Sequence, residues 1–352
     1  MGLKKLIHWS QTDFTDLPWR KNRTIYGTLV SEIMLQQTTV GTVKNHYERF
    51  LKRFPNLKSL AKATEEEVLV AWKGLGYYRR ARNLKKISEY IHIQCNGKFP
   101  TSTVELQEIP GIGPYTSHAL IAIGNDARGL AVDANLERVI ARLYGLKFEK
   151  GPKLQKKILE LFLADKIFAG FDLSYRALNE ALMDLGRTYC QARKASCELC
   201  PLNKECQAYK EQDPLAYPLE NSLKAKTTEE HDLHLLRLLV IKKDKILVYK
   251  KTEKEWLAGQ YEVPTMIIST TDKKLQQYPC LKNKLDHKKL RQFKTGITKY
   301  KIINSILETN KEMIKALGFT GDLQWKDLNN ENSNLSTASY KAIKFIAIKE
   351  TV

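Results

Sequence analysis

The sequence joins two helical stretches by the segment Ile109-Pro-Gly-Ile-Gly-Pro-Tyr-Thr116. The glycines on either side of Ile112 allow a tight turn with positive φ, because neither has a Cβ. Such a turn leaves backbone N–H groups free at the start of the next helix, where they suit a phosphate. A helix-hairpin-helix of this kind grips a nucleic-acid backbone without reading its sequence. We therefore expect Gly111 and Gly113 to contact a DNA backbone, although a plain corner between two helices has the same pattern.

Helical periodicity extends outward from this segment, from about residue 26 to residue 201. Apolar residues recur at three- and four-residue steps in 40–54, 136–143 and 178–185, as expected for buried helix faces. Glycine and proline interrupt the pattern repeatedly, so no coiled-coil register survives. The sequence therefore predicts an all-α region over residues 1–212.

Beyond residue 212 the pattern changes. Residues 213–230 are polar and include Pro214 and Pro218, which is typical of a linker. Apolar stretches at 234–240 and 246–249 surround a polar turn and predict two strands. We expect a small α+β domain over residues 231–352, with further strand-like stretches at 261–263 and 300–303 and helix-like ones at 306–317 and 339–348.

Four of the six cysteines form a C-x6-C-x2-C-x5-C run: Cys190, Cys197, Cys200 and Cys206. Thiolates this close in sequence usually hold a metal, and nothing indicates the oxidising compartment that disulfides need. Zinc usually takes two C-x2-C pairs with a longer spacer. A single C-x2-C with wider gaps suits a cubane with four thiolate ligands. We expect a 4Fe-4S cluster, with zinc or unligated thiols as the alternatives.

The net charge of the 352-residue chain is +19, and both the helical and the α+β regions are basic. A surplus spread over two domains indicates a long polyanion as partner, or simply a lysine-rich solvated surface. No apolar run approaches the roughly 18 residues that cross a bilayer, and the N-terminus lacks the pattern of a cleaved export signal. We expect a soluble, monomeric intracellular protein, located in the cytoplasm of a bacterium and associated with its nucleoid.

A second chemical signal follows the hairpin, in the segment Val132-Asp-Ala-Asn-Leu-Glu-Arg-Val139. Asp133 or Asn135 can serve simply as the N-cap of the helix that follows. The alternative is a functional carboxylate that faces the ligand of the hairpin.

Hairpin, aspartate and cysteine run, in this order, resemble the endonuclease III superfamily of base-excision DNA glycosylases. The motifs cover residues 17–206 almost without a gap. Within the superfamily, four of them resemble the MutY family of adenine DNA glycosylases: Leu17-Pro-Trp-Arg20, Ser31-Glu-Ile-Met-Leu-Gln-Gln-Thr38, Gly74-Leu-Gly-Tyr-Tyr78 and Ala181-Leu-Met-Asp-Leu-Gly186.

The resemblance implies a multidomain protein with an all-α helix-hairpin-helix glycosylase core. A six-helix barrel-type module over about 26–132 would be inserted between the N-terminal segment and a cluster module over about 133–206. Residues 231–352 resemble the family's Nudix-like lesion-recognition domain in size and position, although their residues match weakly. They lack the Arg-Glu-x-x-Glu-Glu run of a working Nudix hydrolase, which indicates a resemblance of fold only.

Cleavage of an N-glycosidic bond requires a neutral leaving base and a stabilised sugar cation, and two carboxylates are the general solution. Glu32 lies among Val30, Ile33 and Met34, and burial there would favour its protonated form. By itself Glu32 also fits an exposed helix position. The resemblance implies that Glu32 protonates the adenine ring and that Asp133, kept ionised, stabilises the sugar cation.

Tyr115 determines the sub-class. Superfamily members that also nick the strand have a lysine here, which forms a Schiff base with the sugar. A phenol cannot do so, and the resemblance therefore implies a monofunctional enzyme that leaves the abasic site intact. A packing role for Tyr115 at a helix start is the alternative.

Weaker assignments follow from the same resemblance. Asn135 is similar to the companion of the catalytic aspartate, and Ala134 stands where the family usually has glycine. Thr298, in Ile297-Thr298-Lys299, takes the place of the family's Phe-Ser-His reader of 8-oxoguanine. The remaining positions line the adenine pocket (Trp19, Arg20, Glu180) or wedge into the duplex while adenine is extruded (Gln37, Thr38, Tyr77). Each also fits ordinary helix or loop surface.

The sequence therefore predicts a base-excision repair enzyme that hydrolyses adenine from double-stranded DNA where it is mispaired with 8-oxoguanine or guanine. Two alternatives remain. One is a related glycosylase that acts on another mismatched base, such as thymine. The other is a DNA-binding module without catalytic activity.

Overall fold

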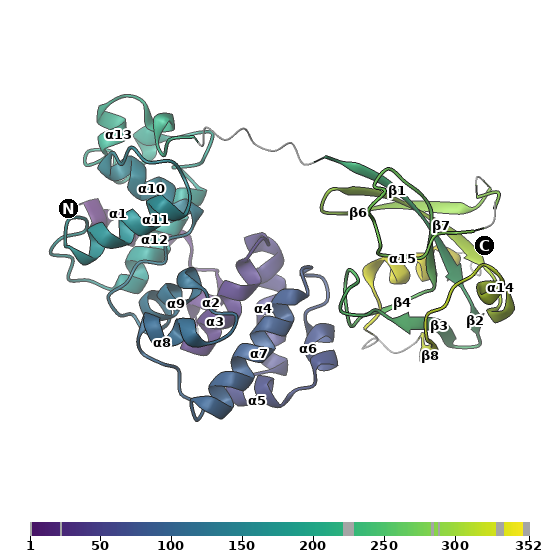
Figure 1. Ribbon diagram of the computed structural model, residues 1–352. Coiled ribbons are helices and arrows are strands. Elements are labelled where there is room, and N and C mark those ends of the chain that lie inside the picture. The colour runs from purple at the N-terminus through teal and green to yellow at the C-terminus, as the bar shows by residue number, and fades with distance from the viewer. Residues whose placement is uncertain are drawn as a thin grey trace. The chain divides into compact units, whose positions relative to one another are not determined.

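The computed structural model describes residues 2–21, 23–220, 229–282, 285–287, 289–328 and 334–347 (Figure 1). The chain forms two compact units. One comprises Met1–Ala63 and Arg79–Lys224, and the other Thr64–Tyr78 and Ala225–Val352. Within the described ranges, every helix is too short or too polar to cross a bilayer.

The first unit is helical, as the periodicity predicts. The three predicted apolar faces belong to α4 (Val40–Arg53), α10 (Ala134–Tyr144) and α12 (Tyr175–Arg187). The unit further contains α1 (Gly2–Asp13), α2 (Pro18–Lys21), α3 (Ile25–Leu35), α5 (Leu57–Lys62), α7 (Arg79–Gln94), α8 (Thr103–Glu108), α9 (Pro114–Ala119), the π-helix Leu120–Gly124, α11 (Pro152–Leu163) and α13 (Gln207–Lys210).

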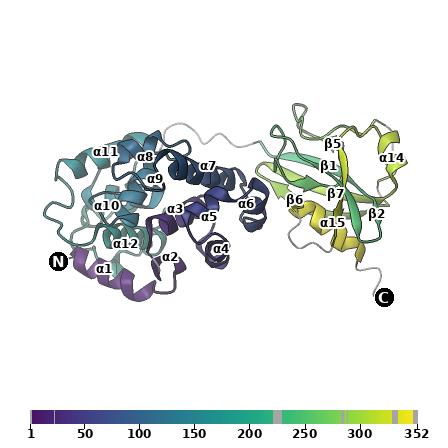
Figure 2. The same ribbon diagram turned by 90° about the horizontal axis from the view of Figure 1, so that it is seen from below.

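The N-terminal helix completes the core of the module that carries the cysteines. Figures 1 and 2 both show α1 beside α12. Leu6 of α1 is fully buried in one apolar cluster with Leu136 of α10 and Leu178 of α12. Helices α2 to α9 therefore lie, in sequence, between two segments that pack together.

The hairpin between α8 and α9 has the expected turn, but only one of its glycines requires positive φ. Gly111 has φ 99°, and a Cβ there would also lie 3.5 Å from the side chain of Ile87. Gly113 has φ −93° and is the N-cap of α9, with Pro114 next to it. The turn therefore uses the conformational freedom of glycine at Gly111 and not at Gly113.

The second unit contains α6 (Glu65–Ala71) and two sheets. One sheet has the order β5-β1-β7-β6, with β1 parallel to β7 and antiparallel to β5. In the other, β3 pairs with β2, β4 and β8. The elements are β1 (His231–Leu239), β2 (Ile241–Lys242), β3 (Lys245–Lys250), β4 (Tyr261–Glu262), β5 (Thr265–Thr270), β6 (Arg291–Ile297), β7 (Tyr300–Glu308), α14 (Lys311–Ala316), β8 (Leu323–Asp327) and α15 (Thr337–Ala347).

Two local predictions for this region need correction. The helix expected over 306–317 is wrong at its start, because residues up to Glu308 extend β7 along β1. Residues 213–220, expected in the linker, lie against the helical unit: Tyr217 is 3% exposed and its carbonyl accepts a hydrogen bond from Arg142 Nε at 3.0 Å. Residues 221–228 of the expected linker lie outside the described residues, as does Ile348 at the end of the last expected helix.

A buried ion cluster lies in the second unit. The Glu262 carboxylate accepts hydrogen bonds from Arg237 Nη1 at 2.7 Å and from Lys251 Nζ at 2.6 Å, and all three side chains are at most 2% exposed. Burial alone would raise the pKa of Glu262, but the charges of Lys251 and Arg237 lower it to about 2. Each of the three buried charges thus has a partner of opposite sign, since Arg237 and Lys251 share the Glu262 carboxylate.

Candidate active site

A cavity of about 690 Å³ opens in the helical unit, between the end of α3, the start of α9, the start of α10 and the end of α12. It brings together eight of the residues expected to act on DNA or its base, although they come from positions 19 to 135. Its lining consists of Leu17, Trp19, Arg20, Glu32, Leu35, Gln36, Gln37, Thr38, Thr39, Val40, Tyr115, Asp133, Ala134, Asn135, Met183, Asp184 and Arg187.

Glu32 lies within α3, a helix buried over most of its length, and is only 6% exposed. Its Oε2 accepts a hydrogen bond from Tyr115 Oη at 2.5 Å. Burial raises the pKa of Glu32 to about 7; the bond from Tyr115 opposes this rise, and the charges of Asp133 and Glu180 add to it. A carboxyl group with this pKa is a suitable proton donor near neutral pH.

Asp133 is at once the N-cap of α10 and a carboxylate of the cavity, so the two interpretations of this residue are compatible. Its Oδ1 accepts the backbone N–H of Asn135 at 2.9 Å and of Leu136 at 2.8 Å. Its Oδ2 accepts from Asn135 Nδ2 at 2.9 Å. These three hydrogen bonds fix the position of the carboxylate at the N-terminus of α10.

Asn135 is held in turn by Arg138, a residue that the sequence analysis missed. Arg138 Nη2 donates to Asn135 Oδ1 at 2.9 Å and to the Gly186 carbonyl at 2.8 Å, while Nε donates to the Cys190 carbonyl at 2.8 Å. Gly186 also has a steric role, because a Cβ there would lie 2.7 Å from Asn135 Cβ. The orientation of Asn135 therefore depends on contacts with the end of α12.

The floor of the cavity is a network of charged side chains. Arg20 Nη1 donates to Asp184 Oδ2 at 2.9 Å, and Arg187 Nε donates to Asp184 Oδ1 at 3.0 Å. Glu180 does not line the cavity, but it lies behind it: its Oε1 accepts from Arg23 Nη1 at 2.8 Å, and its Oε2 lies 3.6 Å from Arg20 Nε. Burial raises the pKa of Glu180 above its usual value, although the charges of Arg20 and Arg23 oppose this rise. The family resemblance pointed to Glu180, whereas Asp184, Arg187 and Met183 could be assigned only in three dimensions.

Other predicted residues lie elsewhere. Gly111 and Gly113 belong to the hairpin and do not line the cavity. Tyr77 and Thr298 belong to the second unit. Tyr77 is 53% exposed, and Thr298 is an exposed turn residue between β6 and β7 with φ 49°. Both side chains are exposed, and their roles remain predictions.

The four cysteines of the run share one neighbourhood. Burial raises the pKa of Cys197, Cys200 and Cys206, and the charges of neighbouring thiols of the run raise each of the three further. Cys190 Sγ accepts a hydrogen bond from Arg142 Nη1 at 3.3 Å. In the described part of the chain, however, no three His, Cys, Asp or Glu side chains are close enough together to hold a single metal ion. The donor chemistry, four thiols within mutual electrostatic reach, still fits a multinuclear iron–sulfur group.

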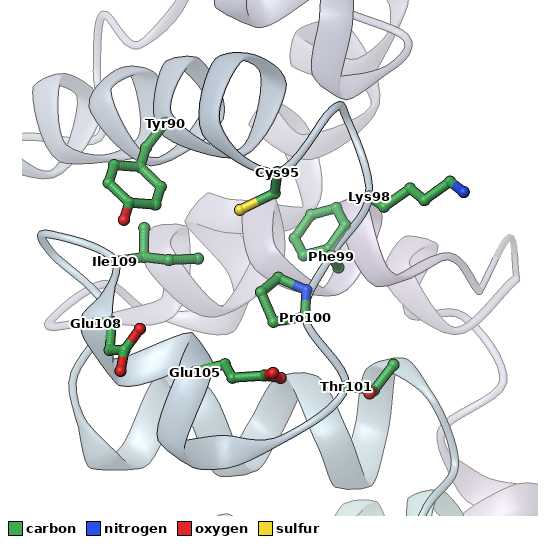
Figure 3. A pocket seen from close by; sticks show the side chains of 9 residues that line it. All are labelled: Tyr90, Cys95, Lys98, Phe99, Pro100, Thr101, Glu105, Glu108 and Ile109. Carbon is green, nitrogen blue, oxygen red and sulfur yellow. The ribbon is translucent and has the colours of Figure 1, made fainter.

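A second cavity of the helical unit, of about 410 Å³, contains none of the predicted residues (Figure 3). It lies between the C-terminal end of α7 and α8, with Tyr90, Cys95, Phe99 and Ile109 among its walls. Lys98 points away from it. Glu105 and Glu108 also line it, but none of the residues expected to act on DNA does.

Comparison with known proteins agrees with this geometry. Residues 30–164 match the model of the HhH-GPD superfamily base excision DNA repair protein. The chain is 32% identical over 284 residues to the adenine DNA glycosylase of Buchnera aphidicola subsp. Schizaphis graminum, covering 79% of this chain and 78% of that protein. It is 37% identical over 207 residues to the adenine DNA glycosylase of Buchnera aphidicola subsp. Acyrthosiphon pisum, covering 58% of each.

A thymine-DNA glycosylase is also similar. The enzyme of that name from Aeropyrum pernix is 32% identical over 213 residues, which cover 58% of this chain and 93% of that protein. The solved structure of a thermostable thymine-DNA glycosylase has a TM-score of 0.51 and 29% identity, covering 59% of this chain and 95% of its own. The match to the adenine DNA glycosylase of Buchnera aphidicola subsp. Schizaphis graminum covers 79% of this chain, which is more than residues 1–224, so it includes part of the second unit. With 32% identity over this length, the chain belongs to the adenine DNA glycosylase family.

Proposed function

We propose that the protein hydrolyses the N-glycosidic bond of adenine in double-stranded DNA, where adenine is mispaired with 8-oxoguanine or guanine. The observation that carries the proposal is the acid pair of the cavity. Glu32, with a pKa raised to about 7, faces Asp133, whose carboxylate accepts three N–H bonds. Two carboxylates separated by environment in this way provide one proton donor and one anion.

In the proposed reaction the extruded adenine enters the cavity beside Trp19, whose ring packs edge-on against Tyr47 with a centroid distance of 5.8 Å. Protonated Glu32 donates its proton to a ring nitrogen and makes the base a neutral leaving group. Asp133 stabilises the positive charge that develops on the sugar as the C–N bond breaks. Water then adds to the sugar, and its proton passes to the ionised Glu32.

The reaction is proposed to stop at the abasic site. Among the described residues that line the cavity none is a lysine, and Tyr115 occupies the position next to Glu32. Burial and the neighbouring carboxylates raise the pKa of Tyr115 well above its usual range, so the phenol stays neutral and acts as a hydrogen-bond donor. Neither form of a phenol makes a Schiff base.

Cys190, Cys197, Cys200 and Cys206 are proposed to hold a 4Fe-4S cluster. Such a cluster would crosslink the loop that begins at the end of α12, where the Cys190 carbonyl already accepts a bond from Arg138. The basic residues Arg193, Lys194 and Lys204 of this loop would then face a phosphate backbone. The second unit is proposed to be a Nudix-like domain that contacts the base opposite adenine through the exposed turn at Thr298.

One assay tests the proposal. Duplexes that contain adenine opposite 8-oxoguanine, adenine opposite guanine, or thymine opposite guanine are incubated with the protein and analysed with and without alkali. We expect strand breaks at adenine after alkali treatment and few before it. Breaks without alkali would contradict the monofunctional mechanism. Cutting at thymine alone would support the second candidate, which the similarity to thymine-DNA glycosylases favours.

A second test uses the variant D133N, which keeps the shape of the side chain and removes its charge. Asp133→Asn should abolish turnover while DNA affinity stays near that of the unmodified protein. An equal loss of affinity would mean that Asp133 is only a helix cap. The Fe–S proposal has a separate readout: iron and acid-labile sulfide in the purified protein, with zinc measured in the same samples.

A further inference from the structure

Arg80 holds the turn that follows α3, the helix of Glu32, where the chain lines the cavity. It lies at the start of α7 and is 7% exposed. Its Nη1 donates to the carbonyls of Ile33 at 3.2 Å and Met34 at 2.8 Å, and also to the carbonyl of Gln36. Its Nη2 donates to Thr38 Oγ1 at 2.9 Å. One guanidinium thus donates to four acceptors between Ile33 and Thr38.

These acceptors have a clear need for a donor. The last carbonyls of a helix have no partner within the helix, and the negative end of its dipole favours a cation. Helix α3 ends at Leu35, so the carbonyls of Ile33 and Met34 belong to this group. Because Arg80 supplies a buried charge to both, the end of α3 is satisfied by a side chain from another helix.

The turn beyond α3 has an unfavourable backbone conformation. Gln37 has φ 55°, which a non-glycine residue rarely adopts, and its side chain is exposed. A residue in this region persists only where its surroundings fix it. The backbone carbonyl before Gln37 and the hydroxyl after it both accept from Arg80. Gln37 is therefore held in its left-handed conformation from both sides, at the edge of the cavity.

We infer that Arg80 is a positioning residue that pre-organises the Gln36–Thr38 turn as the wedge that enters the duplex when the target base is extruded. The inference rests on the proposed function. It assigns to Arg80 a contribution to extrusion and not to bond cleavage, since Arg80 does not line the cavity. Extrusion has its own cost, which depends on how firmly the base is stacked and paired.

The experiment compares the extrusion and cleavage steps in four variants. R80M removes the donors and keeps the bulk, R80K retains a cation with donors, T38V removes the hydroxyl acceptor alone, and R79A is the matched control at the exposed neighbouring position. Single-turnover adenine release is measured opposite guanine and opposite an abasic-site analogue, where pairing no longer opposes extrusion. The fluorescence of 2-aminopurine at the target position reports unstacking.

With adenine opposite guanine, we expect R80M to lose at least tenfold in rate and most of the fluorescence rise. Opposite the abasic analogue the loss should shrink to about threefold or less. R80K should recover part of the rate, T38V should show a smaller loss of the same kind, and R79A should behave like the unmodified protein.

Equal losses on both substrates would overturn the inference, because they would place the defect in cleavage or in folding. An unchanged rate in R80M would also overturn it. If R80M does not fold, T38V and R80K decide the question by the same comparison. Failure of the unmodified protein to release adenine would instead refute the proposed function, so the two failures can be told apart.

Discussion

The hydroxyl group of Tyr115 should set the pH range of the enzyme. Its bond to Glu32 Oε2, 2.5 Å long, favours the ionised form of a carboxyl group whose pKa burial raises to about 7. Replacing Tyr115 by phenylalanine removes this donor and leaves the burial. The pKa of Glu32 should therefore rise further. A hydrogen bond to a charged group contributes about 1.5–3 kcal/mol, which corresponds to a rise of about 1–2 pH units.

The single-turnover rate of adenine release, measured from pH 5 to pH 10, reports this pKa. Activity requires protonated Glu32, so the rate should fall with rising pH, with a midpoint near 7 in the unmodified protein. In Y115F the midpoint should lie about 1–2 units higher. The control is Y26F, which removes another buried tyrosine hydroxyl, the one that donates to the Phe54 carbonyl at 2.9 Å. A midpoint in Y115F equal to or below that of the unmodified protein would refute the reasoning.

Three further predictions concern stability and geometry. The folded-state pKa of Glu32 is raised from 4.5 to about 7. The contribution of protonated Glu32 to stability is therefore complete below pH 4.5 and is lost as pH rises through 7. In chemical denaturation, E32Q should raise the free energy of unfolding by about 3 kcal/mol at pH 8 and by much less at pH 4. G186A should slow adenine release at least tenfold, because its Cβ would displace Asn135, whereas G41A, with open space around the new Cβ, should not; equal rates would contradict the role of Gly186. E262Q should destabilise the second unit by about 3–5 kcal/mol in thermal unfolding at neutral pH, since it leaves two buried cations uncompensated; because the pKa of Glu262 is lowered to about 2, this difference should disappear as pH falls from 4.5 through 2.

The helical core could be predicted from local sequence, because amphipathic periodicity and helix breakers act over a few residues. The faces in α4, α10 and α12 follow directly from the spacing of apolar residues. The second unit was predicted less well. Residues 306–308 have an apolar pattern that fits a helix, and they are a strand only because β7 pairs with β1, about 70 residues earlier. Strands β5 and β8 were missed for the same reason, since their partners β1 and β3 are distant in sequence. Strand β6 was also missed, although its partner β7 follows it directly in the chain.

The candidate site divides along the same line. Local sequence alone marked the hairpin glycines, Asp133 at a helix start and the cysteine run, since each depends on neighbours in the chain. Only the tertiary structure decided that Glu32 is buried and bonded to Tyr115, 83 residues away. The same holds for the contacts of Arg80 and Arg138. A pKa raised by burial and a charge shared among distant carbonyls are properties of packing, and spacing along the chain does not contain them.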